Sequence, residues 1–133
     1  MTCHRIIIGL ASNSPHCEQS VAVAADALRN IFSDIRVSRA EITAPLEGHG
    51  ANYANAVAVA MTSLSPEAII IAMKALETNA GRQKLNRDDI PLDLDLLDYD
   101  GQELPELKLP RRAQLSLNFN RRALAELQYQ LHI

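Results

Sequence analysis

The stretch 88–98 reads Asp-Asp-Ile-Pro-Leu-Asp-Leu-Asp-Leu-Leu-Asp, and it says more about the fold than any other segment of the chain. Its acidic and apolar residues alternate, which is typical of a strand with one buried face and one open face. In such a strand Asp93 and Asp95 lie on one face, and the intervening leucines lie on the other. We therefore predict a strand over residues 90–99 with two carboxylates on its open face, while Asp98 has the opposite parity.

Helix-start signals and apolar segments precede this strand. Ser14-Pro15 and Ser65-Pro66 each place a capping hydroxyl before a proline, which favours the first turn of a helix. In chain order we predict a strand over 4–12, a helix after Ser14, strands over 35–42 and 53–61, a helix from Ser65 to Gly81, the strand over 90–99 and a helix over 120–130. This βαββαβ order predicts an α+β, ferredoxin-like fold: an antiparallel sheet with two helices on one face and a C-terminal helical tail.

The composition indicates one globular domain over residues 1–133, because a chain that is 47% hydrophobic and 22% charged can bury a sizeable core. A net charge of −3 and an aromatic content of 4% argue against a nucleic-acid partner. No apolar run is long enough for a transmembrane helix, and Cys3 and Cys17 are consistent with reduced thiols. We therefore expect a cytoplasmic protein without a membrane partner.

The strand predicted over 53–61 changes from polar to apolar along one face. Alternate residues share that face, polar at its start and apolar further on: Tyr53, Asn55, Val57, Val59 and Met61. We expect this face to form the floor of a pocket that runs into the core.

Two interpretations of Asp93 and Asp95 remain open at this point. Mg²⁺ is commonly held by one or two carboxylates, with water and substrate phosphates as its other ligands, so a nucleotide-phosphate enzyme is one interpretation. The other is the solvated face of an amphipathic strand.

Charged residues before this strand also have two interpretations. Arg82, Lys84 and Arg87 could contact a polyphosphate, or they could belong to an ordinary solvated loop. Glu77 could accept a hydrogen bond from a nucleotide, or it could be an exposed helical charge. Neither the Gly-x-x-x-x-Gly-Lys-Ser/Thr nor the Gly-x-Gly-x-x-Gly phosphate loop occurs in the chain.

Four segments, taken together and in order, carry a resemblance. They are Ile8-Gly9-Leu10-Ala11-Ser12-Asn13, then Thr43-Ala44-Pro45-Leu46 with Tyr53-Ala54-Asn55-Ala56-Val57, then 64–82, then Leu92-Asp93-Leu94-Asp95-Leu96-Leu97. Over about residues 5–119 the chain resembles the 6-hydroxymethyl-7,8-dihydropterin pyrophosphokinases of folate biosynthesis.

The resemblance implies the ferredoxin-like fold and the transfer of pyrophosphate from ATP to the hydroxymethyl group of a pterin, leaving AMP. It implies that Asp93 and Asp95 hold two Mg²⁺ ions and act in catalysis together with Arg82. The residues expected to bind the pterin are Thr43, Leu46, Tyr53, Asn55 and Phe119. The residues expected to contact the nucleotide are Glu77, Arg82, Lys84 and Arg111.

The chain departs from the family's pattern around the phosphates. Ile90 and Leu117 align with arginines of the family, and Arg111 aligns with a histidine; a shifted alignment would use Arg121 or Arg122 as the second arginine. Each lost arginine removes a charge-assisted contact. Two alternatives to a pyrophosphokinase therefore stay open: a divergent homologue that binds a pterin or a nucleotide with little or no transfer, and an interaction domain whose acidic strand is solvated.

Overall fold

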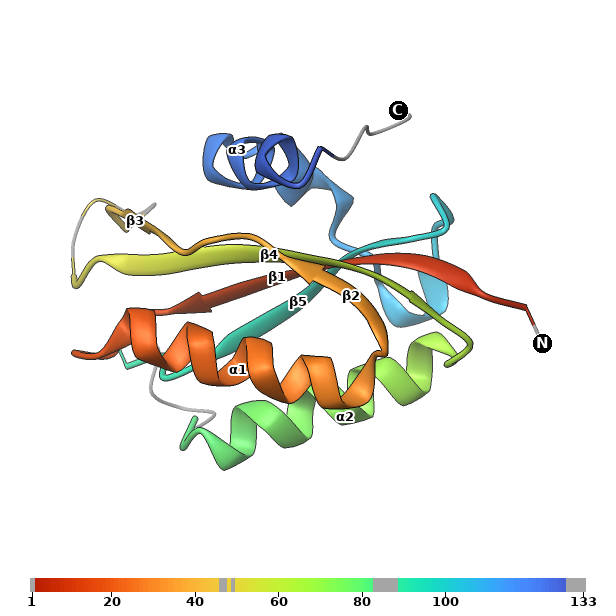
Figure 1. Ribbon diagram of the computed structural model, residues 1–133, viewed down its shortest axis with the longest axis horizontal. Coiled ribbons are helices and arrows are strands. Elements are labelled where there is room, and N and C mark those ends of the chain that lie inside the picture. Colours follow the sequence, from red (N-terminus) through yellow and green to blue (C-terminus); the bar gives the residue numbers. More distant parts are fainter. Residues whose placement is uncertain (1, 46–47, 49, 83–88, 129–133) are drawn as a thin grey trace.

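The computed structural model describes residues 2–45, 48, 50–82 and 89–128, and a twisted sheet runs through its centre (Figure 1). Its elements are β1 (His4–Ser12), α1 (Cys17–Ile31), β2 (Asp34–Val37), β3 (Glu41–Thr43), β4 (Tyr53–Thr62), α2 (Pro66–Asn79), β5 (Asp93–Tyr99), the 3-10 turns η1 (Pro105–Leu107) and η2 (Arg112–Ser116), and α3 (Asn118–Glu126). The strand order is β2-β4-β1-β5, with β3 also paired to β4, and every pairing is antiparallel.

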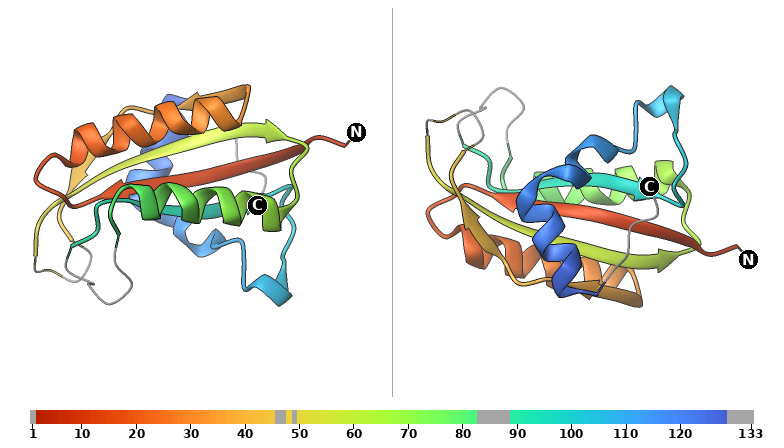
Figure 2. Two further views of the ribbon diagram at one scale, coloured as in Figure 1. Left: turned by 90° about the horizontal axis from the view of Figure 1, so that it is seen from below. Right: turned by 90° about the horizontal axis from the view of Figure 1, so that it is seen from above.

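Helices cover both faces of the sheet. α1 and α2 lie on one face, and η2 and α3 lie on the other (Figure 2). A first core cluster fills the space under α1 and α2, and a smaller second cluster, with Ile7, Val57 and Leu97 at its centre, lies under α3. The predicted α+β, ferredoxin-like arrangement is confirmed. No helix in the described part of the chain has the length and apolar character needed to cross a membrane.

The start of α2 agrees with the signal in the sequence. Ser65 Oγ accepts a hydrogen bond from Ala68 N at 3.2 Å, and Pro66 is the first residue of the helix. The chain leaves the helix through Gly81, whose φ of +94° suits a residue without a side chain.

The predicted start of α1 at Ser14 is wrong. The helix begins at Cys17, with His16 in the capping position and no side-chain cap. Ser14 does not cap it because its hydroxyl hydrogen-bonds the hydroxyls of Ser12 and Ser20.

The single strand predicted over 35–42 is two short strands, β2 and β3. Both strands pair with β4. Three residues, 38–40, separate β2 from β3, whereas only residues 56 and 57 of β4 lie opposite this gap. Ser38 bridges this break, because its N–H donates to Val57 O and its Oγ accepts from Val57 N, each at 2.9 Å.

The last strand and the last helix also differ from their predicted bounds. β5 begins at Asp93 rather than at residue 90, because Pro91 has no N–H and Ile90 N donates to the side chain of Asn13 at 2.7 Å. The helix predicted over 120–130 is α3, which ends at Glu126; residues 129–130 lie outside the described part.

A bulge at Leu97 changes the parity of β5. Leu96 pairs with Ile8, whereas Asp98 pairs with Ile7, so Leu97 is the extra residue. Ile7 belongs to the second core cluster, and Asp98 therefore lies on the α3 face of the sheet, together with the two aspartates nearer the start of the strand. The predicted opposite parity of Asp98 is wrong.

Candidate active site

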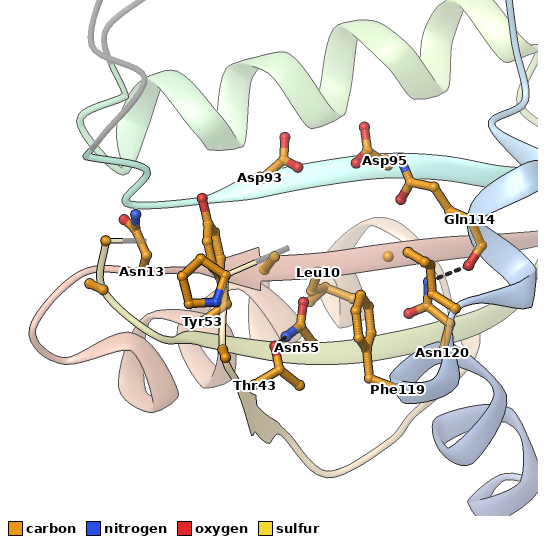
Figure 3. Close-up of a pocket in the computed structure, with 17 residues that line it drawn as sticks. Leu10, Asn13, Thr43, Tyr53, Asn55, Asp93, Asp95, Gln114, Phe119 and Asn120 are labelled. Atoms are coloured by element: carbon orange, nitrogen blue, oxygen red, sulfur yellow. Dashed lines mark hydrogen bonds between the residues drawn. The ribbon is translucent and has the colours of Figure 1, made fainter. Parts of the chain in front are cut away.

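A cavity of about 590 Å³ opens on the α3 face of the sheet (Figure 3). The end of β1 and the starts of β4 and β5 form its floor, residues 43–45 and 50–51 form one wall, and η2 and α3 form another. Its volume is in the range of small-molecule sites.

Asp93 and Asp95 extend from β5 into this cavity. Their register partners on β1 are Ala11 and Gly9, whose small size leaves space beside the carboxylates. In Figure 3 both carboxylates project from the same side of β5. The alternation of residues 88–98 therefore predicted their common face correctly.

Asp93 has a cationic partner within the protein. Arg82 Nη1 lies 2.6 Å from Asp93 Oδ1 and 3.0 Å from Glu77 Oε2. Glu77 Oε2 also accepts from Leu94 N at 2.8 Å, so this ionic cluster ties the end of α2 to the edge of β5. Burial raises the pKa of Glu77, and the contacts with Leu94 and Arg82 oppose that rise. Glu77 is thus a partly buried member of the cluster and not an exposed helical charge.

Asp95 carries the less compensated charge of the pair. Its pKa is raised to about 7, chiefly by burial and then by the charge of Asp93 and a hydrogen bond with it. Arg111, with Nε 3.6 Å from Asp95 Oδ1, and a hydrogen bond from Gln114 act in the opposite direction. Two adjacent carboxylates with this excess of negative charge are suited to a hard cation.

The cavity offers few side chains that can bind a metal ion, and this number limits the metal ions that suit the site. Within residues 2–45, 48, 50–82 and 89–128, no group of three or more His, Cys, Asp or Glu side chains could hold a metal ion. Mg²⁺ keeps several water ligands and takes others from substrate phosphates, so two carboxylates are enough to hold it. The residues present therefore fit Mg²⁺ with a nucleotide.

The far side of the cavity offers an aromatic surface and an oriented amide. Asn55 Nδ2 donates to Thr43 Oγ1 at 2.6 Å, which fixes the amide of this buried side chain. Phe119 of α3 lies beside Asn55, and Tyr53 lies further along β4 (Figure 3). The floor continues into the second core cluster, as the pattern over 53–61 predicted. An aromatic face next to a fixed amide is suited to a flat heterocycle with hydrogen-bonding edges.

The comparison with known families shows to which protein family the chain belongs. Residues 7–129 match the model of the 7,8-dihydro-6-hydroxymethylpterin-pyrophosphokinase family. The chain belongs to this family. No curated protein sequence matches it. Members of the family are pyrophosphokinases of folate biosynthesis, which use ATP with Mg²⁺ and bind a pterin.

In this pyrophosphokinase-family chain, the structure brings most of the predicted site residues to one place. The predicted pterin-binding residues that line the cavity are Thr43, Tyr53, Asn55 and Phe119. Of the predicted nucleotide contacts, Glu77 and Arg82 lie beside Asp93, and Arg111 lies beside Asp95. Leu46 and Lys84, with Arg87 of the same basic segment, lie outside the described residues.

Arg122, one of the two arginines considered in the shifted alignment, has an acidic partner on β3. Arg122 is bound to Glu41, with Nε 2.7 Å from Oε1 and Nη2 on the other carboxylate oxygen. Leu117 and Phe119 both line the cavity.

Three residues of the cavity wall were not singled out as site residues from the sequence. Asn13 ends the first motif, and it both lines the cavity and binds Ile90. Gln114 reaches Asp95 from η2, a segment without a recognisable motif. Asn120 is buried on the apolar side of α3 and donates to Gln114 O at 2.8 Å. A polar residue at a buried helical position was the available signal for Asn120.

Proposed function

We propose that this protein transfers pyrophosphate from ATP to 6-hydroxymethyl-7,8-dihydropterin in a Mg²⁺-dependent reaction. One observation carries the proposal: the carboxylates of Asp93 and Asp95 share a single cavity with the aromatic and amide wall formed by Phe119 and Asn55. A carboxylate pair suited to Mg²⁺ and a wall suited to a flat heterocycle thus line the same cavity.

The pterin would bind against the wall formed by α3, β3 and β4. Phe119 would stack on its ring, and the amide of Asn55 would hydrogen-bond its edge, held in place by Thr43. Tyr53 would line the outer part of the pocket, and Leu46 is proposed to add an apolar contact. This placement would direct the hydroxymethyl group towards the two aspartates.

The triphosphate would lie along β5, beside Arg82 and Arg111. Bound Mg²⁺ would offset the charge of the phosphates. The pterin hydroxymethyl oxygen forms a bond to the β-phosphorus, the bond from that phosphorus to the α,β-bridging oxygen breaks, AMP leaves, and the hydroxyl proton is released. The chain's own contribution is to align the two substrates and to present guanidinium groups to the phosphates. Glu77 would hold Arg82, and Lys84 is proposed to add a further phosphate contact.

The test is a turnover assay with Mg-ATP and 6-hydroxymethyl-7,8-dihydropterin. We expect AMP and a diphosphorylated pterin in equal amounts, and loss of both with Asp95→Asn. The matched control is Asp26→Asn, which removes an exposed carboxylate paired with Arg29 on α1. Turnover that survives Asp95→Asn, or no turnover at high protein concentration, would contradict the proposal.

One observation favours the second candidate, a homologue that binds without transfer. Leu117 presents an apolar side chain to the cavity, and Ile90 is buried, at the two positions where arginines of the family align. Calorimetry with the pterin and a non-hydrolysable ATP analogue separates the two candidates, because tight binding without AMP formation identifies the second one.

A further inference from the structure

A partly buried ion pair lies further along β5, beyond the two cavity aspartates. Asp98 is 6% exposed, and its Oδ1 accepts a hydrogen bond from Arg112 Nη1. Its Oδ2 accepts from Gly101 N at 3.3 Å, so both carboxylate oxygens are bound. The bulge at Leu97 makes this contact possible, because it turns Asp98 towards the face on which η2 lies.

The segment that Arg112 anchors reaches Asp95 with two side chains. Arg111 precedes Arg112 and places its guanidinium Nε 3.6 Å from Asp95 Oδ1. Gln114, two residues after Arg112, lines the cavity and donates a hydrogen bond to Asp95. Both side chains leave the backbone within two residues of the ion pair, so a change in the path of this segment moves both of them.

Few other contacts fix the start of this segment. Arg111 N donates to Leu96 O at 2.8 Å, and Leu115 is buried in the second core cluster. Asn120 Nδ2 also donates to Gln114 O at 2.8 Å, so the later part of the segment has anchors of its own, and the ion pair adds a contact at its first turn through Arg112. The buried carboxylate of Asp98 contributes to holding this turn, since removal of one partner from a buried ion pair strongly destabilises the fold around it.

We propose that Asp98 and Arg112 are a positioning pair, which holds Arg111 and Gln114 against Asp95 so that Asp95 can take part in binding the metal and nucleotide. The proposal deepens the proposed function and rests on it. Neither residue of the pair lines the cavity, and its effect on the reaction passes through Asp95.

The test compares four variants of the full chain: Arg112→Met, Arg112→Lys, Asp98→Asn and the double variant Asp98→Asn with Arg112→Met. Calorimetry with Mg²⁺ and a non-hydrolysable ATP analogue measures nucleotide binding, and steady-state assays separate kcat from the KM for the pterin. Two controls test whether the loss of an arginine or the loss of stability alone explains the effects. Arg29→Met removes an arginine from an exposed pair on α1, and Phe32→Leu destabilises the first core cluster beyond the end of α1.

We expect Arg112→Met and Asp98→Asn each to lower Mg-nucleotide affinity and kcat by about tenfold or more, because small displacements of positioning groups have large effects. The KM for the pterin should stay within about twofold, since α3 has its own anchor in the Arg122–Glu41 pair. The double variant should be no worse than the worse single variant, and Arg112→Lys should recover part of the loss because it keeps the charge. Arg29→Met should behave as wild type.

The proposal is overturned if the Arg112 and Asp98 variants keep wild-type kcat and nucleotide affinity. It is also overturned if Phe32→Leu, at an equal loss of melting temperature, lowers kcat as much. If the wild-type protein binds no Mg-nucleotide, the proposed function fails, and the NMR signals of the Gln114 side-chain amide still decide the positioning role. They should shift in Arg112→Met and not in Arg29→Met, and unchanged signals would refute the proposal.

Discussion

Arg82 Nη1 lies 2.6 Å from Asp93 Oδ1, so one of the two cavity carboxylates already has a cation of the protein beside it. The ion pair of Asp95 within the described residues is longer, with Arg111 Nε 3.6 Å from Asp95 Oδ1. The two aspartates are therefore chemically unequal. In the proposed reaction, Arg82 would compete with a metal ion for Asp93 and would also be available to a phosphate group.

Replacement of Arg82 by methionine should separate these two roles. Without the competing guanidinium, Mg²⁺ alone should bind at least as tightly as to wild type. Turnover should fall by about a hundredfold or more, because a charge that stabilises the transferring phosphates is lost. Calorimetry with MgCl₂ alone and the AMP-release assay measure the two effects. Weaker Mg²⁺ binding with normal turnover would contradict the account of Arg82.

The raised pKa of Asp95 makes the stability of the metal-free protein depend on pH. The ordinary pKa of the group is 3.8, and in the folded chain it is about 7, so the folded protein binds this proton more tightly than the unfolded chain. The resulting stabilisation is complete below the unfolded pKa, and it is lost as the pH rises through about 7.

Asp95→Asn should remove this dependence. The difference in unfolding free energy between the variant and the wild type should grow from pH 4 to pH 8, by up to about 4 kcal/mol, since one pKa unit corresponds to about 1.4 kcal/mol. Urea denaturation at several pH values measures it, and titrating groups that do not interact with Asp95 cancel in the difference. A difference that does not change with pH would show that Asp95 has an ordinary pKa.

The same proton should compete with the metal ion. Below pH 7, metal binding must release the proton from Asp95, so the apparent Mg-nucleotide affinity should fall by up to about tenfold for each unit of pH. Calorimetry in two buffers with different ionisation enthalpies detects the released proton. Affinity that is constant between pH 5.5 and 8 would count against Asp95 as a ligand.

Gly9 lies opposite Asp95 and under Leu97. A Cβ at Gly9 would lie 3.2 Å from Leu97 Cδ1, and Leu97 is fully buried. Gly9→Ala should therefore lower the free energy of unfolding by about 1–2 kcal/mol, as expected for overpacking in a filled core. Thermal or urea denaturation measures the change. An increase in stability would show that Leu97 has room to move.

The amide of Asn55 should matter for the pterin and not for the nucleotide. Asn55→Ala should weaken pterin binding by about tenfold or more through the loss of a hydrogen bond in a buried site. The affinity for Mg-nucleotide should stay within about twofold, because β1 lies between Asn55 on β4 and the aspartates on β5. Thr43→Val, which removes only the acceptor of the Asn55 amide, should have a smaller effect of the same kind. Equal losses for both ligands would contradict this division of the site.

Local patterns in the sequence predicted the parts of the fold that depend on a single strand or helix. The alternation around Asp93 and Asp95 placed both on one face, and Ser65-Pro66 marked the start of α2. These features are set by backbone geometry within a few residues, so they can be inferred without knowing the rest of the chain.

The features that the sequence did not predict depend on distant partners. Strict alternation through Leu96 and Leu97 would place the side chain of Asp98 in the apolar core under α1 and α2. A charged residue at such a position is a sequence signal for a bulge. Asp98 is paired with Arg112, which lies 14 residues later in the chain. Asp93 is paired with Arg82, which lies 11 residues earlier, just after the end of α2. Ser14 is the exception, because its hydroxyl is bound by two nearby hydroxyls, those of Ser12 and Ser20, and does not cap the helix.

The central claim is that Asp93 and Asp95 hold a divalent cation together with a nucleotide. Mn²⁺ in place of Mg²⁺ tests it most directly, because a bound paramagnetic ion broadens the NMR signals of nearby nuclei. With a non-hydrolysable ATP analogue present, Mn²⁺ should erase the backbone amide signals of residues 93–95 in the wild-type protein but leave them in Asp95→Asn. Signals from 93–95 that survive Mn²⁺ and nucleotide in the wild-type protein would contradict the claim.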